Sequence, residues 1–534
     1  MPDADPASEP DADPEVEHAS VPVPVPAPAP SSSSDSEADA NRPGLRFGFD
    51  AGGEYQLRGN AMSDIPLPTI PPSADVDRTS PPGELGQNYF AEQWVRLRAR
   101  VGLVDHPGGS ERVAPFLSLV GEADLLYGVA FGDLAQGTRP AAMPRDQPGY
   151  PGIRLRHLYL DWRSPIGVFR LGQMGFRWGL GIVANDGETP PVFGDYRFGD
   201  LVRRLLFATR PLGESSPLTV AISGDWVAWD LLADFERPCP SGQGSCGDVA
   251  FQGVLAAFWE EGDDMVGGYV AYRTQKNYLD DFLDVFAADL YARFHVDEPS
   301  GGRILLAAEA AFFQGQTSIT RTPTRPQTEV QQFLVAAQAG RISSDLDVIL
   351  EGGYATGDSN TEDGVERRAT FDPDHRVGLV LFPEVIAWQT ARAAWLAQSP
   401  DTFGRPARGA ELIPTNGGVS GAFYLFPHAM FRPTEWLDVR IGSVLGWSST
   451  DIVDPYRQRA EGRSVNYRGG DPTRRDLGVE LDASVRFKIS LSSLVRLELG
   501  LEGGVLFPGA AFDDANGTRM GEVGLARLRG GLVF

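Results

Sequence analysis

Hydrophobic and polar residues alternate with a period of two along most of this chain. In residues 94–103, valine, leucine and alanine occupy one set of alternate positions, and Arg96, Arg98 and Arg100 occupy the other. Residues 479–488 repeat this pattern with acidic and basic residues on the polar face. Such alternation predicts β-strands that each have one apolar and one charged face.

Eighteen segments have this pattern and are bounded by turn residues. Nearly all are long enough, at nine residues or more, to cross a bilayer as tilted strands. The predicted strands are 44–60, 88–104, 112–131, 152–163, 166–180, 201–210, 217–229, 248–260, 264–274, 282–297, 302–316, 328–342, 344–357, 418–432, 436–448, 475–490, 493–507 and 521–534.

The connections alternate in length. Those after even-numbered strands are short turns, whereas those after odd-numbered strands are mostly long, with 275–281 the short exception. Outer-membrane barrels combine short periplasmic turns with long extracellular loops. The sequence therefore predicts an all-β fold, an 18-stranded antiparallel transmembrane β-barrel of the outer membrane. A soluble sheet with one wet face is the alternative that the strand pattern alone leaves open.

The C-terminal residue supports the barrel. The last strand sets Leu528, Leu532 and Phe534 against Arg527 and Arg529, so its aromatic end lies on the apolar face. A terminal Phe in this position resembles the signal that outer-membrane barrels present to their assembly machinery. Closure of the sheet gives every backbone N–H and C=O group a hydrogen-bond partner, which hydrocarbon cannot provide.

Composition and charge narrow the class. The net charge of −25 argues against a nucleic-acid-binding protein, which would carry a basic patch. Residues 1–42 form an acidic, Pro- and Ser-rich segment that we expect to be disordered, ahead of a barrel domain over 43–534. No signal peptide is visible, so an exported barrel requires processing or a start upstream; a protein that is not exported is the alternative.

The polar faces give the candidate pore lining. An 18-stranded barrel is wide enough for an aqueous channel, and guanidinium groups bind carboxylates in two-pronged contacts. The arginines on these polar faces either form a track for anionic solutes or brace the barrel wall by pairing with acids such as Glu122, Glu309, Glu351 and Glu480. The predicted pore-lining residues are Arg96, Arg98, Arg100, Arg170, Arg293, Arg440, Arg486, Arg496, Arg527 and Arg529.

Two stretches resemble a known family. Residues 353–373, GYATGDSNTEDGVERRATFDP, and residues 169–195, FRLGQMGFRWGLGIVANDGETPPVFGD, look like segments of the alginate-export porins of Gram-negative outer membranes. The resemblance implies a monomeric 18-stranded barrel whose arginine-lined pore conducts an anionic polysaccharide.

The long loop 358–417 carries two further features. Asp358, Asn360 and Asp363 resemble the start of a calcium loop, although the twelfth position is Ala369; a solvated acidic turn is the alternative. Residues 383–397 have apolar residues at helical spacing after Pro-Glu, which predicts a short helix. That helix either folds into the mouth as a gate or packs on top of the loops.

Cysteine and histidine complete the inventory. Cys239 and Cys246 fall within one predicted extracellular loop, where an oxidising compartment favours a local disulfide. The six histidines are scattered, and none lies in a G-x-S-x-G setting. Without a nucleophile paired to a base, catalysis is not indicated, and no cofactor beyond the possible Ca²⁺ is expected.

The sequence thus predicts a passive porin-like channel in the cell outer membrane for anionic organic solutes or oligosaccharides. Its expected partners are membrane lipid, the barrel-assembly machinery and the anionic solute, with no nucleic acid and a monomeric state. The alternatives are a surface scaffold that binds a partner through its loops, and an outer-membrane barrel hydrolase.

Overall fold

A computed structural model describes residues 44–67, 88–106, 116–133, 152–194, 199–236, 246–299, 301–321, 325–398, 409 and 412–534. The predicted tail 1–42 lies outside these residues. The strands are β1 (Gly44–Met62), β2 (Asn88–His106), β3 (Leu117–Asp133), β4 (Gly152–Ser164), β5 (Gly167–Gly175), β6 (Leu201–Thr209), β7 (Leu218–Trp229), β8 (Val249–Glu261), β9 (Asp264–Lys276), β10 (Phe282–Asp297), β11 (Arg303–Thr317), β12 (Thr328–Ile342), β13 (Leu346–Ala355), β14 (Val365–Glu366), β15 (Ala422–Thr434), β16 (Leu437–Ser448), β17 (Asp476–Ser490), β18 (Arg496–Pro508) and β19 (Val523–Val533).

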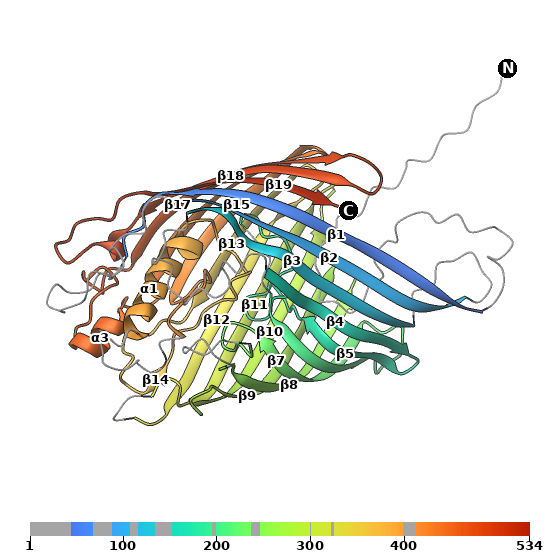
Figure 1. Cartoon of the computed structure of the whole chain (residues 1–534), viewed down its shortest axis with the longest axis horizontal. Helices are drawn as coiled ribbons and strands as arrows, with labels where there is room; N and C mark the ends of the chain where they lie inside the picture. The colour runs from blue at the N-terminus through green and yellow to red at the C-terminus, as the bar shows by residue number, and fades with distance from the viewer. Residues whose placement is uncertain are drawn as a thin grey trace, which may run out of the picture.

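The strands form one closed antiparallel barrel. Each strand pairs with its neighbours in chain order, β13 pairs directly with β15, and β1 closes the ring against β19. The two-residue strand β14 stands outside this ring and runs parallel to the start of β12. Eighteen strands therefore make the barrel, which confirms the strand number and order predicted from the alternation. Figure 1 shows the tilted strands wrapping around the lumen.

The outer surface of the barrel is apolar and its interior is charged. Leu97, Leu290 and Leu501 are 40%, 67% and 59% exposed on the outer face, whereas Arg96 and Glu480 are almost fully buried inside. A water-soluble sheet would bury its apolar face instead, so the soluble alternative is excluded. This arrangement is that of a barrel whose outer face meets lipid.

Aromatic side chains mark both ends of the apolar surface. Near the short turns, Trp162 stacks on Phe169 with 5.1 Å between ring centroids. Toward the other end, Phe423 stacks on Trp447 at 4.8 Å. Two aromatic girdles of this kind flank the hydrocarbon region in outer-membrane barrels.

The pairing of β19 with β1 closes the barrel. The backbone of Phe534 exchanges hydrogen bonds with Gly53, at 2.6 Å and 2.9 Å. A Cβ atom at Gly53 would lie 2.5 Å from the carbonyl oxygen of Arg96, so only glycine fits between the two neighbouring strands. Phe534 is 47% exposed on the outer face, as the alternation predicted.

The helices lie at one end of the barrel. Figure 1 shows α1 (Ala387–Gln398) and α3 (Pro455–Glu461) at the end opposite the described C-terminus. A π-helical turn, η2 (Leu381–Ile386), leads directly into α1, and a 3₁₀ turn, η4 (Ala510–Phe512), follows β18. No helix among the described residues is long and apolar enough to cross a membrane.

Three details differ from the sequence-based expectation. The fifth strand ends at Gly175 rather than at residue 180, because the following residues leave the wall and enter the lumen. The short elements β14 and α3 were not predicted. The expected start of the third strand, residues 112–115, lies outside the described residues.

Candidate solute pathway in the lumen

A cluster of arginines on β2 and β4 surrounds one carboxylate of β3. Arg98 Nε and Arg156 Nε donate to Glu122 at 2.5 Å and 2.7 Å. Arg96 makes a two-pronged contact with Asp124, at 2.7 Å and 3.0 Å. Arg96 and Arg156 are buried, whereas the Arg98 side chain is 50% exposed. Two of these guanidinium groups therefore brace the wall, and Arg98 also faces solvent.

Arg156 reaches this cluster through a β-bulge. The register between β3 and β4 shifts between Glu122 and Ala123, where Arg156 is the additional residue. An additional residue lets two consecutive side chains point to one face. Arg156 and His157 accordingly both contact lumen groups, Glu122 and Glu188.

Two more of the predicted arginines line the same wall. Arg100 Nε donates to Ser118 Oγ at 3.1 Å, and Arg170 Nε donates to the Asp161 carboxylate at 2.9 Å. Arg170 is buried, and Arg100 is half-buried. Arg100 thus lies beside Arg98 and donates to a hydroxyl group, whereas Arg98 donates to a carboxylate.

A second arginine group lies on β16, β17 and β19. Arg527 and Arg529 both contact Glu502 of β18, at 3.0 Å and 2.8 Å. Arg440 lies 3.6 Å from Asp438, and Arg486 is the register partner of Asp438 on β17. Since β19 is bonded to β1 and β1 to β2, this group and the Glu122 cluster occupy one continuous side of the barrel.

The remaining two predicted residues lie apart from these groups. Arg293 Nε donates to the carbonyl oxygen of Asp263 in a short turn. Arg496 pairs with Glu498 at 3.0 Å near another short turn and is half-exposed. Both belong to the short-turn end of the barrel, away from the loop contacts described next.

The described parts of the β5–β6 connection, residues 176–194 and 199–200, enter the lumen. The backbone N–H of Gly181 donates to the carboxylate of Glu309 on β11 at 3.0 Å. The carbonyl oxygen of Asp186 accepts from Arg156 on β4 at 2.7 Å. The connection thus contacts wall strands well separated around the barrel.

The same connection also reaches the second arginine group. Arg440 donates to the carbonyl oxygen of Val192 at 2.8 Å, and Arg529 donates to that of Gly194 at 2.5 Å. The N–H of Gly194 donates to Glu502 at 3.3 Å. Residues 181–194 therefore cross the lumen from β4 and β11 to β16–β19.

The long β13–β15 connection enters the lumen as well. Glu480 of β17 accepts three backbone N–H groups, from Leu379 and Val380 at 2.5 Å and 2.7 Å and from Leu381 at 2.7 Å. Gly378, with φ 71°, occupies the left-handed region just before them. Successive N–H groups that converge in this way form an anion-binding nest, here filled by a wall carboxylate.

His375 fixes a second point of this connection. Its Nε2 lies 3.2 Å from Glu351 of β13, which also accepts from the Tyr424 hydroxyl at 2.6 Å. Its Nδ1 lies 3.0 Å from the carbonyl oxygen of Leu180. Burial opposes the imidazolium charge, but the Glu351 carboxylate and the hydrogen bonds outweigh it and raise the pKa of His375.

The two inserted connections bind each other. Asp372 N–H donates to the Ile182 carbonyl oxygen at 2.8 Å, and Gly199 N–H donates to the Asp374 carboxylate at 2.5 Å. They also share an apolar core inside the barrel, in which Phe371, Val380, Leu381 and Phe382 of the β13–β15 connection pack with the inward-facing wall residues Tyr424, Phe426, Val444 and Leu506. Part of the lumen is therefore filled by packed apolar side chains, next to the arginine-bearing wall.

The predicted calcium turn is held by internal hydrogen bonds. Asp358 accepts from the backbone N–H groups of Asn360 and Arg367, at 2.8 Å and 3.1 Å. Asp363 accepts from Arg367 Nη1 at 2.7 Å. These contacts occupy oxygens that a metal ion would need, and calcium binding stays a prediction.

A different group of possible ligands lies together in the lumen. Ligand atoms of Glu122, His157 and Glu188 fall within 4.8 Å of one another, the one such group of His, Cys, Asp and Glu among the described residues. Burial raises the pKa of Glu188, and the negative charge of Glu122 adds to this effect. The arginines around Glu122 supply the positive charge that a metal ion would otherwise provide.

The remaining predicted residues are placed as follows. Cys246 is disulfide-bonded, and Cys239, the other cysteine of the chain, lies outside the described residues. Helix α1 overlaps the segment 383–397 that was expected to be helical and ends one residue beyond it, and its residues Ala391 and Leu396 are fully buried. His428 Nδ1 lies 3.2 Å from its neighbour's carbonyl oxygen, that of Phe426.

Comparison with known proteins gives a match in overall shape alone. No family model and no curated protein matches the chain. Similar solved structures include OccK8 (OprE) of Pseudomonas aeruginosa, with a TM-score of 0.46, 10% identity and coverage of 91% of this chain and 98% of that one. OccAB1 of Acinetobacter baumannii gives 0.47, 9%, 91% and 96%. OccK2 (OpdF) of Pseudomonas aeruginosa in complex with glucuronate gives 0.46, 10%, 90% and 97%.

Proposed function

We propose that this protein is an outer-membrane porin-like channel for the passive transport of anionic organic solutes or oligosaccharides. The observation that carries the proposal is the half-exposed side chain of Arg98, beside Arg100, on the arginine-bearing side of a charged lumen. Charged residues that line a pore select ions of the opposite sign, and an exposed guanidinium can bind a carboxylate through two hydrogen bonds.

The inserted connections give this channel its selectivity. They fill part of the lumen with apolar core, so a solute has to pass beside the arginine wall. The buried ion pairs, such as Arg96 with Asp124, hold that wall in shape. Arg98 and Arg100 are the residues that we assign to solute contact.

Single-channel recording in planar bilayers tests the proposal. We expect an anion-selective current in a salt gradient, and a lower anion-to-cation permeability ratio after Arg98→Ala combined with Arg100→Ala. Arg496→Ala, at an exposed pair near a short turn, is the matched control. Selectivity that survives the double substitution would refute the arginine assignment, and a barrel without measurable current would refute the channel.

The narrower proposal is an anionic polysaccharide such as alginate as the solute. The sequence resemblance of residues 169–195 and 353–373 supports it. The partners that go with this function are membrane lipid and the barrel-assembly machinery, which would recognise the terminal strand. The protein would act as a monomer.

A scaffold function is the second candidate. It is favoured by the apolar core that the two inserted connections build inside the barrel, since packed side chains fill space that a channel needs open. The same recordings separate the two, because a scaffold with a filled lumen passes no current.

A further inference from the structure

Arg98, one of the two arginines assigned to solute contact, has unused hydrogen-bond donors. Its Nε donates to Glu122 at 2.5 Å, and neither of its terminal nitrogens has a hydrogen-bond partner in the part of the chain that the structure describes. Arg100 is alike, since its Nε alone has such a partner there, the Ser118 hydroxyl. The terminal N–H groups of a guanidinium can hold a carboxylate in a two-pronged contact. Both side chains therefore keep these groups available for a solute.

A carboxylate of the β5–β6 connection lies next to Arg98. Glu188 Oε1 is 3.3 Å from Nε2 of His157 on β4. One oxygen of Glu188, one oxygen of Glu122 and one ring nitrogen of His157 all lie within 4.8 Å of one another. Since Glu122 accepts from Arg98, only this carboxylate separates Glu188 from the Arg98 guanidinium.

The backbone of the connection fixes the position of Glu188. The Glu188 N–H donates to Asp186 Oδ1 at 3.1 Å, and the Gly187 N–H donates to Asn185 Oδ1 at 3.0 Å. Gly187 has φ 67°, and a Cβ atom there would lie 2.4 Å from the backbone nitrogen of Gly199. The turn therefore requires glycine at this position, and it holds Glu188 against β4.

Glu188 is the accessible carboxylate of the arginine cluster. Its side chain is 31% exposed, whereas those of Glu122 and Asp124 are 3% and 7% exposed. The three guanidinium groups on β2 and β4 outnumber these two wall carboxylates, and Glu188 adds a third negative charge. A solute that approaches Arg98 thus meets a negative charge supplied by the inserted connection and not by the wall.

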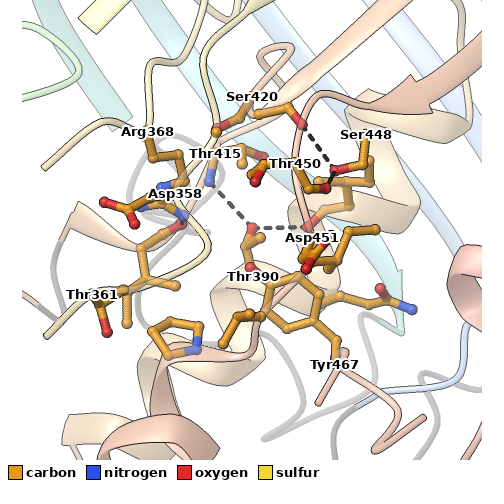
Figure 2. Close-up of a pocket in the computed structure, with 18 of the residues that line it drawn as sticks. Asp358, Thr361, Arg368, Thr390, Thr415, Ser420, Ser448, Thr450, Asp451 and Tyr467 are labelled. Atoms are coloured by element: carbon orange, nitrogen blue, oxygen red, sulfur yellow. Dashed lines mark hydrogen bonds between the residues drawn. The ribbon is translucent and has the colours of Figure 1, made fainter. Parts of the chain in front are cut away.

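The cavity among the loops at the α1 end offers an anion no second site of this kind. Figure 2 shows Asp358 and Asp451 together with Arg368 at this cavity. Its lining holds three carboxylates against two arginines, and the hydroxyl groups of Thr390 and Ser448 hydrogen-bond to backbone carbonyl oxygens. The charge that attracts an anionic solute therefore lies at the arginine wall and not in this cavity.

A negative charge beside Arg98 affects how long a carboxylate stays bound there. Conduction requires a solute to bind well enough to enter and weakly enough to leave. Two guanidinium groups with free donors favour tight binding, and a fixed carboxylate next to them repels the bound solute. Because differences in affinity at one site arise mostly from dissociation, this repulsion should act mainly on the rate of release.

We propose that Glu188 sets the residence time of an anionic solute at Arg98, by repelling the bound carboxylate and so promoting its release. The inference rests on the proposed channel function and adds to it a residue that determines specificity. A neutral solute is not repelled, so Glu188 acts on solute charge and not on pore size.

Single-channel recording with gluconate as the probe tests this role. The recordings are made at mildly alkaline pH, where Glu188 is ionised, and gluconate bound at Arg98 blocks the chloride current. We expect Glu188→Gln to lower the half-blocking concentration about three- to tenfold, the effect of removing one unit charge near the bound carboxylate in a partly aqueous site. Slower dissociation of gluconate should account for most of this change.

Four comparisons separate the charge of Glu188 from a structural role. Glu188→Asp keeps the charge and should behave like the parent. Glu214→Gln removes a charge from an exposed position in a short turn and should leave the block unchanged. Sorbitol, the neutral analogue of gluconate, should enter proteoliposomes equally fast through the parent and through Glu188→Gln. In an Arg98→Ala background, Glu188→Gln should have a much smaller effect, because the carboxylate is no longer held beside residue 188.

The inference is overturned if folded Glu188→Gln keeps the half-blocking concentration and dissociation rate of the parent, or if its effect is equally large in the Arg98→Ala background. A changed sorbitol rate would also overturn it, because Glu188 would then act by shaping the pore. Glu188→Ala carries the same expectations should Glu188→Gln fail to fold. A current that gluconate never blocks would overturn the role of Glu188 and leave the channel standing, whereas a barrel without current would overturn the channel function itself.

Discussion

The nest that holds Glu480 makes the sharpest prediction about the inserted connections. Replacing Glu480 by Gln keeps one oxygen, which still accepts from Leu379 and Val380. The other carboxylate oxygen, which accepts from Leu381 at 2.7 Å, becomes an NH₂ group that faces a donor. A hydrogen bond to a charged group contributes about 1.5–3 kcal/mol, and the unpaired N–H adds a cost of its own.

We therefore expect Glu480→Gln to favour local release of residues 379–381 by about 3 kcal/mol, which corresponds to roughly a hundredfold. Hydrogen–deuterium exchange of the detergent-solubilised protein measures this directly as faster exchange of the Leu379–Leu381 amides. Glu498→Gln is the matched control, because Glu498 pairs with a half-exposed arginine and such pairs contribute about 0–1 kcal/mol. Equal exchange of these amides in the parent and in Glu480→Gln would refute the anchoring role.

Three further predictions concern the other anchors. Since the pKa of His375 is raised, the stability that its charge contributes is present below its ordinary pKa and is lost as pH rises through the raised value. His375→Gln should abolish this pH dependence, measured as hydrogen–deuterium exchange of the amides around residue 375. A pH dependence that persists in this variant would contradict the prediction. Burial raises the pKa of Asp454, at the N-terminus of α3, to about 7, so the stability of the folded loops falls as pH rises from the ordinary pKa of Asp toward 7. Asp454→Asn keeps the helix cap and should remove this pH dependence from the thermal unfolding of the loops. An unchanged pH profile in the variant would argue against the prediction. Gly53→Val should place its side chain against the Arg96 carbonyl oxygen and lower the yield of closed barrel in a heat-modifiability gel. The control is Gly517→Val, because a Cβ at Gly517, where φ is 76°, meets nothing within 4 Å and closure should stay intact. Equal yields of closed barrel for the two variants would refute the close approach at Gly53.

The wall of the barrel could be predicted from sequence because each strand repeats a local pattern. Alternation along residues 94–103 determines which side chains face lipid. A short turn is then enough to place the next strand beside this one in an antiparallel pair. The arginines of β2 and β19 were therefore assigned to the lumen from their strand positions, and the structure places them there.

The filling of the lumen could not be predicted in this way. Gly181 meets Glu309, and Gly194 meets Glu502, across 128 and 308 positions of sequence, so no local pattern records these contacts. The bulge that turns Arg156 inward also depends on the register with β3. Helix α3 is different, since Asp454, Pro455 and Gly462 are ordinary signals for its two ends and could have been used.

The seam between β1 and β19 has a consequence for the order of folding. Arg527 reaches Asn60 across 467 positions of the chain, and Phe534, the last described residue, bonds to the strand that opens the barrel. Pairings between distant segments form slowly, because the chain between them must first be ordered. The hairpins β2 to β18 can form in sequence, but the ring can close only when β19 has been synthesised and pairs with β1. Until then, the edge of β1 that will pair with β19 and the edge of the last completed strand remain unpaired. Unpaired strand edges are prone to aggregate, so the time before closure is the period of greatest risk.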